Sequence, residues 1–373
     1  MKFSGDRGVS QMPALELHGS CDQTLFGITP SERLRRQLGY RIEALADVKL
    51  VADASTILSD AALDWLIANP HRVLFSRGGN PLAVVLDRAG RVDLGALRAE
   101  GTLADAGLSR AEPQELVGLF NRKLRRTQDG LCFSLAEEEA EPVRWALFQD
   151  VYKGITDIVT KYAFPVPAYH AVRFCAMARI PPNAVTILSI VLTLVVGKLF
   201  YDGAFVSGLA AAWFMTFLDT VDGKLARVTC TSSKFGDKLD HIPDAVHPPL
   251  WWICFAVGVT RVDPYAPFIV ISSAVILATY MLGRLFEVTF KLIHGFNQYL
   301  WRPFDSALRM IIARRNTILV FLTAGVAAND PSAGVDMAAA WSIVTIAVQA
   351  WRFLSASLAA KTGQSPLPWM QQA

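Results

Sequence analysis

The sequence predicts a fold in two parts: a small α/β domain over residues 1–149, then a polytopic α-helical membrane domain over residues 150–373. Hydrophobic residues make up 52% of the chain and charged residues only 18%, with a mean hydropathy of +0.32. This composition is too apolar for an ordinary soluble protein. The apolar residues are also unevenly distributed, because charged runs such as 33–36 and 137–139 interrupt the first part, whereas long apolar runs dominate from residue 184. We therefore place the domain boundary near residue 150.

Six apolar segments follow in the membrane part, at residues 184–200, 204–222, 240–259, 266–282, 317–328 and 337–360. We interpret them as six transmembrane helices. The fifth is short for a span, which needs about 20 residues. We expect it to begin near residue 308 and to carry Arg314 and Arg315 near its end.

Basic residues alternate between the connecting loops. The loops after the second and fourth segments are rich in Lys and Arg, whereas those after the first and fifth have none, and Arg261 stands beside Asp263 in the third. The positive-inside tendency then places both termini and the two basic loops in the cytoplasm, as in a multi-pass protein of the cytoplasmic (inner) membrane. Residues 1–13 are polar and lack the apolar core of a signal peptide, so we expect the α/β domain to remain cytoplasmic.

The segment 150–179 mixes aromatic and basic residues, which predicts a helix lying in the membrane interface. Pro165 and Pro167 favour a break in it, followed by a turn into the membrane. Lys153 and Asp157 on this segment lie near the functional site or are surface charges.

Four aspartates flank the loop between the second and third apolar segments. Asp219 and Asp222 are three residues apart, and Asp240 and Asp244 are four apart, so each pair shares one face of its helix. Carboxylates that converge from two helices repel one another unless cations lie between them, and oxygen ligands suit Mg²⁺ or Mn²⁺. The alternative is that they are solvated carboxylates at helix ends, but four on two consecutive apolar helices favour a function.

These residues belong to a longer pattern, D-x2-D-G-x2-A-R-x8-G-x3-D-x3-D, running from Asp219 to Asp244. It resembles the signature of the CDP-alcohol phosphotransferase family at every fixed position, a match expected by chance in on the order of one in 10¹⁰ windows. Family members often have a Pro-Asn-x-x-Thr segment at the start of the first span, and residues 182–186 are similar. Together with the six spans, the resemblance covers roughly residues 150–360.

The resemblance implies roles for individual residues. Asp219, Asp222 and Asp240 would hold a two-metal Mg²⁺ or Mn²⁺ site, and Asp244 would act as the general base and as a further metal ligand. The CDP-binding positions would be Asp219 and Asp222 with Gly223, Ala226, Arg227 and Gly236. The products would be a phosphodiester and CMP. Since the family commonly dimerises, we expect a homodimer.

The resemblance leaves the donor and the acceptor open. Arg284, Arg302, Arg314 and Arg315 are candidates for binding a phosphorylated acceptor, or they are positive-inside anchors. We expect transfer of a phosphatidyl group from CDP-diacylglycerol to a polyol phosphate in phospholipid biosynthesis, with inositol phosphate preferred to glycerol phosphate. Transfer from CDP-inositol in polar-lipid or osmolyte synthesis is one alternative, and a non-catalytic CDP-alcohol sensor or scaffold is another. A net charge of +3 gives no indication of nucleic-acid binding.

In the first domain, residues 48–52, 82–86 and 72–75 are predicted strands, and residues 60–69 a helix. Residues 29–32 have the pattern of a helix start. The region resembles a degenerate cytidylyltransferase, as in archaeal fusions that make and use CDP-inositol: residues 25–33 keep Gly27 and Arg33 of its nucleotide loop but not the other glycines. We expect a docking, regulatory or dimer-supporting unit. Asp53 is interpreted as a turn residue rather than a metal ligand, and the five scattered cysteines as reduced.

Overall fold

The computed structural model describes residues 14–45, 47–98, 100–121, 124–232, 234–363 and 366–371. Side chains within residues 98–101 and 233–245 lie outside the described set. The chain forms two compact units. Unit 1 is Met1–Tyr152 with two short segments, Ala176–Arg179 and Ala226–Thr231, and unit 2 is Lys153–Cys175, Ile180–Leu225 and Ser232–Ala373.

Unit 1 is built on a five-stranded mixed sheet in the order β1-β2-β5-β4-β6. The central strand β5 is antiparallel to both neighbours, and the outer pairs β1–β2 and β4–β6 are parallel. In that order the strands are Ala14–His18, Val48–Asp53, Pro81–Asp87, Arg72–Phe75 and Ser109–Ala111. Two small ribbons pair β3 (Thr56–Leu58) with β9 (Cys132–Ser134) and β7 (Leu119–Asn121) with β8 (Arg126–Gln128). The α/β region and its three expected strands are confirmed.

Helices α1 (Pro30–Gly39) and α2 (Asp60–Ala68) pack their leucines against the sheet. Because β2 and β5 are buried along nearly their whole lengths, their sequences are mostly apolar rather than alternating. Lys49 interrupts β2 and forms an ion pair with Glu16. The start of α1 is as expected, since the Thr29 side chain caps the helix by accepting a hydrogen bond from the Glu32 N–H at 3.2 Å. Helices α3 (Glu100–Asp105) and α4 (Ala140–Asp150) complete the unit.

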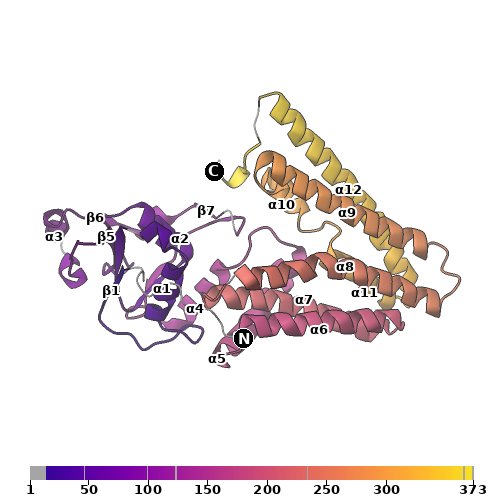
Figure 1. Cartoon of the computed structure of the whole chain (residues 1–373), viewed down its shortest axis with the longest axis horizontal. Helices are drawn as coiled ribbons and strands as arrows, with labels where there is room; N and C mark the ends of the chain where they lie inside the picture. Colours follow the sequence, from indigo (N-terminus) through magenta and orange to yellow (C-terminus); the bar gives the residue numbers. More distant parts are fainter. Residues whose placement is uncertain are drawn as a thin grey trace, which may run out of the picture. The chain divides into compact units, whose positions relative to one another are not determined.

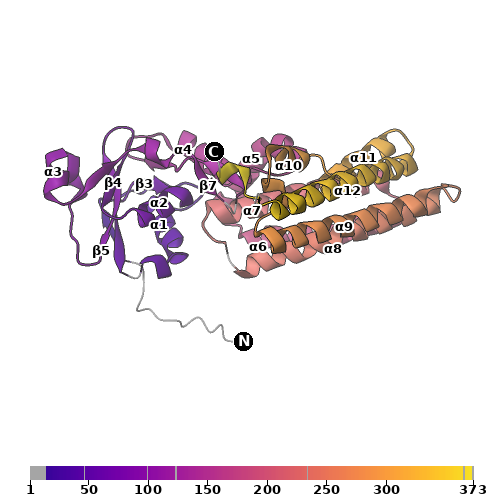
Figure 2. The same ribbon diagram turned by 90° about the horizontal axis from the view of Figure 1, so that it is seen from above.

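Unit 2 is helical, and Figures 1 and 2 show its long helices running alongside one another. Helix α6 packs on α8, and α12 packs on both α9 and α11. The described helices are α5 (Pro165–Met177), α6 (Pro182–Tyr201), α7 (Phe205–Val228), α8 (Lys234–Val262), α9 (Ile269–His294), α10 (Pro303–Leu308), α11 (Arg315–Ala327) and α12 (Pro331–Lys361). Each of the six predicted apolar segments therefore corresponds to a helix.

Within the described part of the chain, three of these helices are long and apolar enough to cross a membrane: α6, α9 and α12. The expected start of the fifth segment near residue 308 is wrong. Its helix α11 begins only at Arg315, because the Ala313 N–H is taken by the Thr345 hydroxyl at 3.1 Å and Arg314 has extended backbone. With 13 residues, α11 is about 20 Å long, which is shorter than the hydrocarbon core of a bilayer.

Two contacts in unit 2 fix the C-terminal helix α12. Asp305 on α10 and Arg352 form a buried two-bond ion pair, with N···O distances of 2.6 and 2.8 Å, and the guanidinium stacks 4.2 Å from the Trp301 ring centre. At the other end, a Cβ added to Gly325 of α11 would lie 2.5 Å from the Gly334 Cα. The backbones of α11 and α12 therefore touch with no side chain between them.

The predicted interfacial segment is broken where its prolines stand. A single π-helical turn, Val159–Ala163, ends at Phe164, and α5 begins at Pro165. Tyr162 and Phe174 on either side of this break are more than half exposed. The location of this segment in the membrane interface stays a prediction.

Candidate active site

The carboxyl end of α7 holds the first two aspartates of the motif. Asp222 is only 3% exposed, and its Oδ2 accepts a hydrogen bond of 2.7 Å from the Thr186 hydroxyl. Thr186 is the threonine of the Pro-Asn-x-x-Thr segment and lies on α6. The two sequence patterns, separated by more than thirty positions in the chain, therefore meet through this bond.

Asp219 forms an ion pair with Arg315, whose Nη2 lies 2.5 Å from Oδ2. Arg315 is the first residue of α11, and its Nη1 is 3.3 Å from Nε2 of His247 on α8. The side chains of Asp219 and Arg315 are each 17% exposed, so the pair is only partly screened by solvent. The arginine predicted to bind an acceptor thus neutralises an aspartate predicted to bind metal.

The next residue along α11 connects this site to the segment before α5. Asn316 Nδ2 donates to Asp157 Oδ1 at 2.9 Å, and Asp157 also accepts from the Thr160 N–H and hydroxyl at 3.0 and 2.8 Å. Burial raises the pKa of Asp157, but these hydrogen bonds outweigh burial and leave the pKa below its usual value. Of the two charges singled out on this segment, Asp157 is therefore connected to the site through Asn316.

The remaining motif residues fall in different settings. Gly223 and Ala226 are half-buried on α7, and Arg227 donates to the Val151 carbonyl at 2.9 Å. The backbone of α8 is helical through Gly236, Asp240 and Asp244, but their side chains lie outside the described residues. Among the side chains that are described, no group of three or more His, Cys, Asp or Glu gathers as a metal site, so the four-carboxylate convergence stays a prediction.

The donor set at the end of α7 nevertheless suits a hard cation. Asp219 and Asp222 offer carboxylate oxygens, and Asp219 already takes a cationic partner. Oxygen donors of this kind are the ligands that Mg²⁺ and Mn²⁺ prefer.

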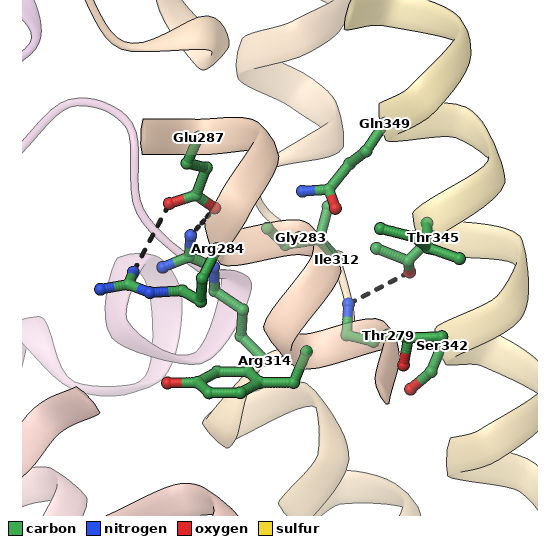
Figure 3. A pocket seen from close by; sticks show the side chains of 12 residues that line it. Thr279, Gly283, Arg284, Glu287, Ile312, Arg314, Ser342, Thr345 and Gln349 are labelled. Atoms are coloured by element: carbon green, nitrogen blue, oxygen red, sulfur yellow. Dashed lines mark hydrogen bonds and ion pairs between the residues drawn. The ribbon is translucent and has the colours of Figure 1, made fainter. Parts of the chain in front are cut away.

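A second polar cluster lies around Glu287 on α9 (Figure 3). Its carboxylate pairs with Arg314 and Arg284, the latter at 3.5 Å, and accepts from the Tyr299 hydroxyl at 2.8 Å. Glu287, Arg284 and Arg314 border a cavity of about 20 Å³ that Thr345 and Gln349 of α12 also line, which is room for about one water molecule. The fourth candidate arginine, Arg302, is exposed and stacks 4.8 Å from the Trp301 ring centre.

Residues 179–348 match the sequence model of the CDP-alcohol phosphatidyltransferase family. These residues form a CDP-alcohol phosphatidyltransferase domain. The enzyme is accordingly a CDP-alcohol phosphotransferase of phospholipid synthesis. It is an integral membrane protein, with three membrane-length apolar helices among the residues that the structure describes.

Three solved structures of phosphatidylinositol phosphate synthase (PgsA1) from Mycobacterium tuberculosis are similar to the chain. The form with CDP-DAG bound is 19% identical over 49% of this chain and 91% of that one, with a TM-score of 0.39. The complex with manganese and citrate is 18% identical over 49% of this chain and 87% of that one, with a TM-score of 0.41. The apo form is 20% identical over 49% of this chain and 93% of that one, with a TM-score of 0.38. No curated protein matches the chain.

The phosphatidyltransferase domain contains two site residues that the sequence analysis missed, His247 and Glu287. Both carried a signal, because His247 follows Asp240 by seven residues and Asp244 by three, which is helical spacing for one face. Glu287 likewise follows Arg284 by three residues on α9. An acid one turn from a candidate anion-binding arginine is a natural partner for it.

Proposed function

We propose that this phosphatidyltransferase transfers the phosphatidyl group of CDP-diacylglycerol to a hydroxyl of a polyol phosphate, with inositol phosphate preferred to glycerol phosphate. The observation that supports it is the buried acidic end of α7, where Thr186 holds Asp222 and Arg315 neutralises Asp219. Carboxylates at this depth favour a role with cations and a charged substrate over a role as solvated helix ends.

In the proposed reaction, Asp244 takes the proton of the acceptor hydroxyl, and the hydroxyl oxygen attacks the phosphorus that carries the diacylglycerol. The bond from that phosphorus to CMP breaks, and CMP leaves with the electron pair. Asp219, Asp222, Asp240 and Asp244 would hold the Mg²⁺ or Mn²⁺ ions, which neutralise the diphosphate and the departing CMP. Gly223, Ala226, Arg227 and Gly236 would contact the CDP group.

The ion pair between Asp219 and Arg315 fits this scheme as a resting arrangement. A cation bound at Asp219 competes with the guanidinium for the same carboxylate oxygen. Arg315 would then be released to face an anion, which reconciles its pairing here with its proposed role in acceptor binding.

The cluster at Glu287 supports a phosphorylated acceptor by the same exchange. Arg284 and Arg314 both pair with this one carboxylate. Because the cavity beside them holds only about one water, a phosphate would bind by taking the place of the carboxylate. A phosphate dianion can displace the carboxylate from the two guanidinium groups, because it offers more charge and more acceptor oxygens. A neutral polyol has no comparable means to do so.

The test is CMP release by the detergent-purified enzyme with Mg²⁺ or Mn²⁺ and CDP-diacylglycerol, with inositol phosphate, glycerol phosphate, inositol and serine as acceptors. We expect release with a phosphorylated acceptor only and its loss in Asp244→Asn. Arg314→Gln should raise the KM for the acceptor at least tenfold, whereas Lys198→Gln, which removes an exposed cation at the far end of α6, should not. Activity with inositol or serine would contradict the acceptor class.

The alternative donor is CDP-inositol, and it replaces the lipid donor in a parallel assay. We further propose that the enzyme is a homodimer of the inner membrane with both termini and the active site in the cytoplasm, as the basic loops predict. A membrane-impermeant thiol reagent that labels Cys21 in intact cells would contradict this orientation. The N-terminal domain is proposed to be a degenerate cytidylyltransferase that supports the transferase rather than activating nucleotides.

A further inference from the structure

The carboxyl end of α7 and the loop after it belong to unit 1. The helix ends in a Schellman motif, with hydrogen bonds from the Thr231 N–H to the Ala226 carbonyl (2.9 Å) and from the Cys230 N–H to the Arg227 carbonyl (3.2 Å). Cys230 takes the left-handed conformation at φ +51°, which usually needs glycine. The motif leaves the next three carbonyl groups of the chain to other donors.

Side chains of α1 bind all three in order. The Val228 carbonyl accepts from Arg33 Nη1 at 2.7 Å, that of Thr229 from Arg36 Nη1 at 2.9 Å, and that of Cys230 from the Tyr40 hydroxyl at 2.8 Å. The donors stand at helical spacing, three and then four residues apart, so they share one face of α1 and its end. Three consecutive carbonyl groups of a loop are thus matched by one helix face.

Burial and charge make this arrangement more than a surface contact. Arg33 is 4% exposed, and all three acceptor residues are buried. Glu32 orients Arg36 through a hydrogen bond of 2.9 Å to its Nε. Two guanidinium groups at the carboxyl end of α7 also face the negative end of its dipole.

We infer that α1 is a positioning element for the catalytic motif and that Arg33, Arg36 and Tyr40 are its positioning residues. We call the three hydrogen bonds from Arg33, Arg36 and Tyr40 the clamp. Asp222 lies about two turns before the clamped end of α7, and α8, which carries the second aspartate pair, begins at Lys234. The loop between them joins the two halves of the motif, so hydrogen bonds to its carbonyl groups would restrict how the proposed metal ligands come together. The catalytic part of this inference rests on the proposed function.

Two residues of the expected nucleotide loop of unit 1 take part in helix contacts instead. The sequence predicts Arg33 as the arginine of a nucleotide loop, but its guanidinium donates a hydrogen bond to the Val228 carbonyl. Gly27, the glycine of the same segment, has φ +73°, and a Cβ there would lie 2.9 Å from the Ala176 carbonyl oxygen at the end of α5. Both remnants of that loop therefore contact helix ends within unit 1.

Cys230 offers a readout of the clamp that is independent of catalysis. It is 7% exposed, and burial raises its thiol pKa. In full-length enzyme with the other four cysteines changed to alanine, we expect Arg33→Ala to speed maleimide modification of Cys230 about tenfold, the effect of losing one buried hydrogen bond. Tyr40→Phe should speed it by a smaller factor, because Tyr40 is 54% exposed. Arg35→Ala removes an exposed arginine of the same helix and should leave the rate unchanged.

Activity supplies the second readout. We expect Arg33→Ala and Tyr40→Phe to lower kcat about tenfold and to raise the Mn²⁺ concentration for half-maximal CMP release, with an unchanged KM for the acceptor. Arg33→Lys should recover part of the kcat and part of the Mn²⁺ affinity. Arg35→Ala, the control, should change neither. If Arg33→Ala does not fold, Tyr40→Phe decides, since it removes a single oxygen.

Unchanged Cys230 labelling in both variants would overturn the clamp. Faster labelling with unaltered kcat and Mn²⁺ dependence would overturn its positioning role. If the wild-type enzyme releases no CMP, the proposed function fails, and the labelling rates still decide whether α1 holds the loop.

Discussion

Asp150 at the end of α4 carries a pH dependence that one substitution should remove. The residue is 8% exposed. Burial is the main cause that raises its pKa to about 6; Asp60 adds to the rise, and Arg126 and Arg33 oppose it. Its position at a helix carboxyl end, where the dipole disfavours negative charge, acts in the same direction as burial. At neutral pH unit 1 therefore folds around an unfavourably placed carboxylate.

The size of the effect follows from the shift. The unfolded chain titrates near 3.8 and the folded one near 6, a difference that corresponds to about 3 kcal/mol. Because the folded pKa is raised, the added stability is present below about pH 4 and is lost as pH rises through about 6. Asp150→Asn keeps the shape and removes the charge, so it should stabilise unit 1 at pH 7–8 by up to about 3 kcal/mol and flatten this dependence.

The assay is hydrogen exchange of strands β2 and β5 in the full-length protein between pH 4 and 8, corrected for intrinsic exchange rates. The control is Asp105→Asn, the same charge change at the exposed end of α3. Equal protection in Asp150→Asn and wild type at pH 8, or a wild-type protein whose strands become more protected between pH 4 and 6, would refute the reasoning.

Three further outcomes are expected. Thr186→Val should lower CMP release about tenfold and raise the divalent cation requirement, because Asp222 loses its hydrogen bond; Thr186→Ser should restore both, and equal activity of the two variants would contradict the assignment. Arg352→Met should lower the free energy of unfolding by about 3–5 kcal/mol, since it leaves Asp305 buried without its partner; thermal unfolding in detergent should show a smaller loss when Asp305→Leu is added. Gly325→Ala should cost about 1–3 kcal/mol in the same assay through backbone overlap, and an unchanged melting temperature would show that the helices can separate.

Much of the fold was accessible from the sequence because local patterns matched their elements. The Thr29 cap, the apolar runs of β2 and β5 and the six apolar segments all correspond to observed elements. The start of α11 was not accessible, since it depends on Thr345, which takes the Ala313 N–H from another helix. The short strands β1 and β6 were also missed, because each is stabilised by pairing with a strand remote in the chain.

The candidate site was likewise accessible from the sequence only in part. The motif indicated the chemistry and named Asp219 and Asp222, but it gave no partners for them. Arg315 reaches Asp219, and His247 contacts Arg315, through tertiary packing of α7, α8 and α11. The spacing of His247 from Asp240 and Asp244 indicates a shared helix face but not this partner. For the same reason, the four arginines proposed as one group divide among Asp219, Glu287 and the surface.

The contact between Gly325 and Gly334 has a consequence for how this sequence can change over time. A side chain at either position would meet backbone of the opposite helix, so a substitution at one is not relieved by any substitution at the other. Among related sequences, these two positions should remain small together or be lost together with the α11–α12 turn. A larger residue at either position would therefore identify related proteins in which α11 and α12 pack differently.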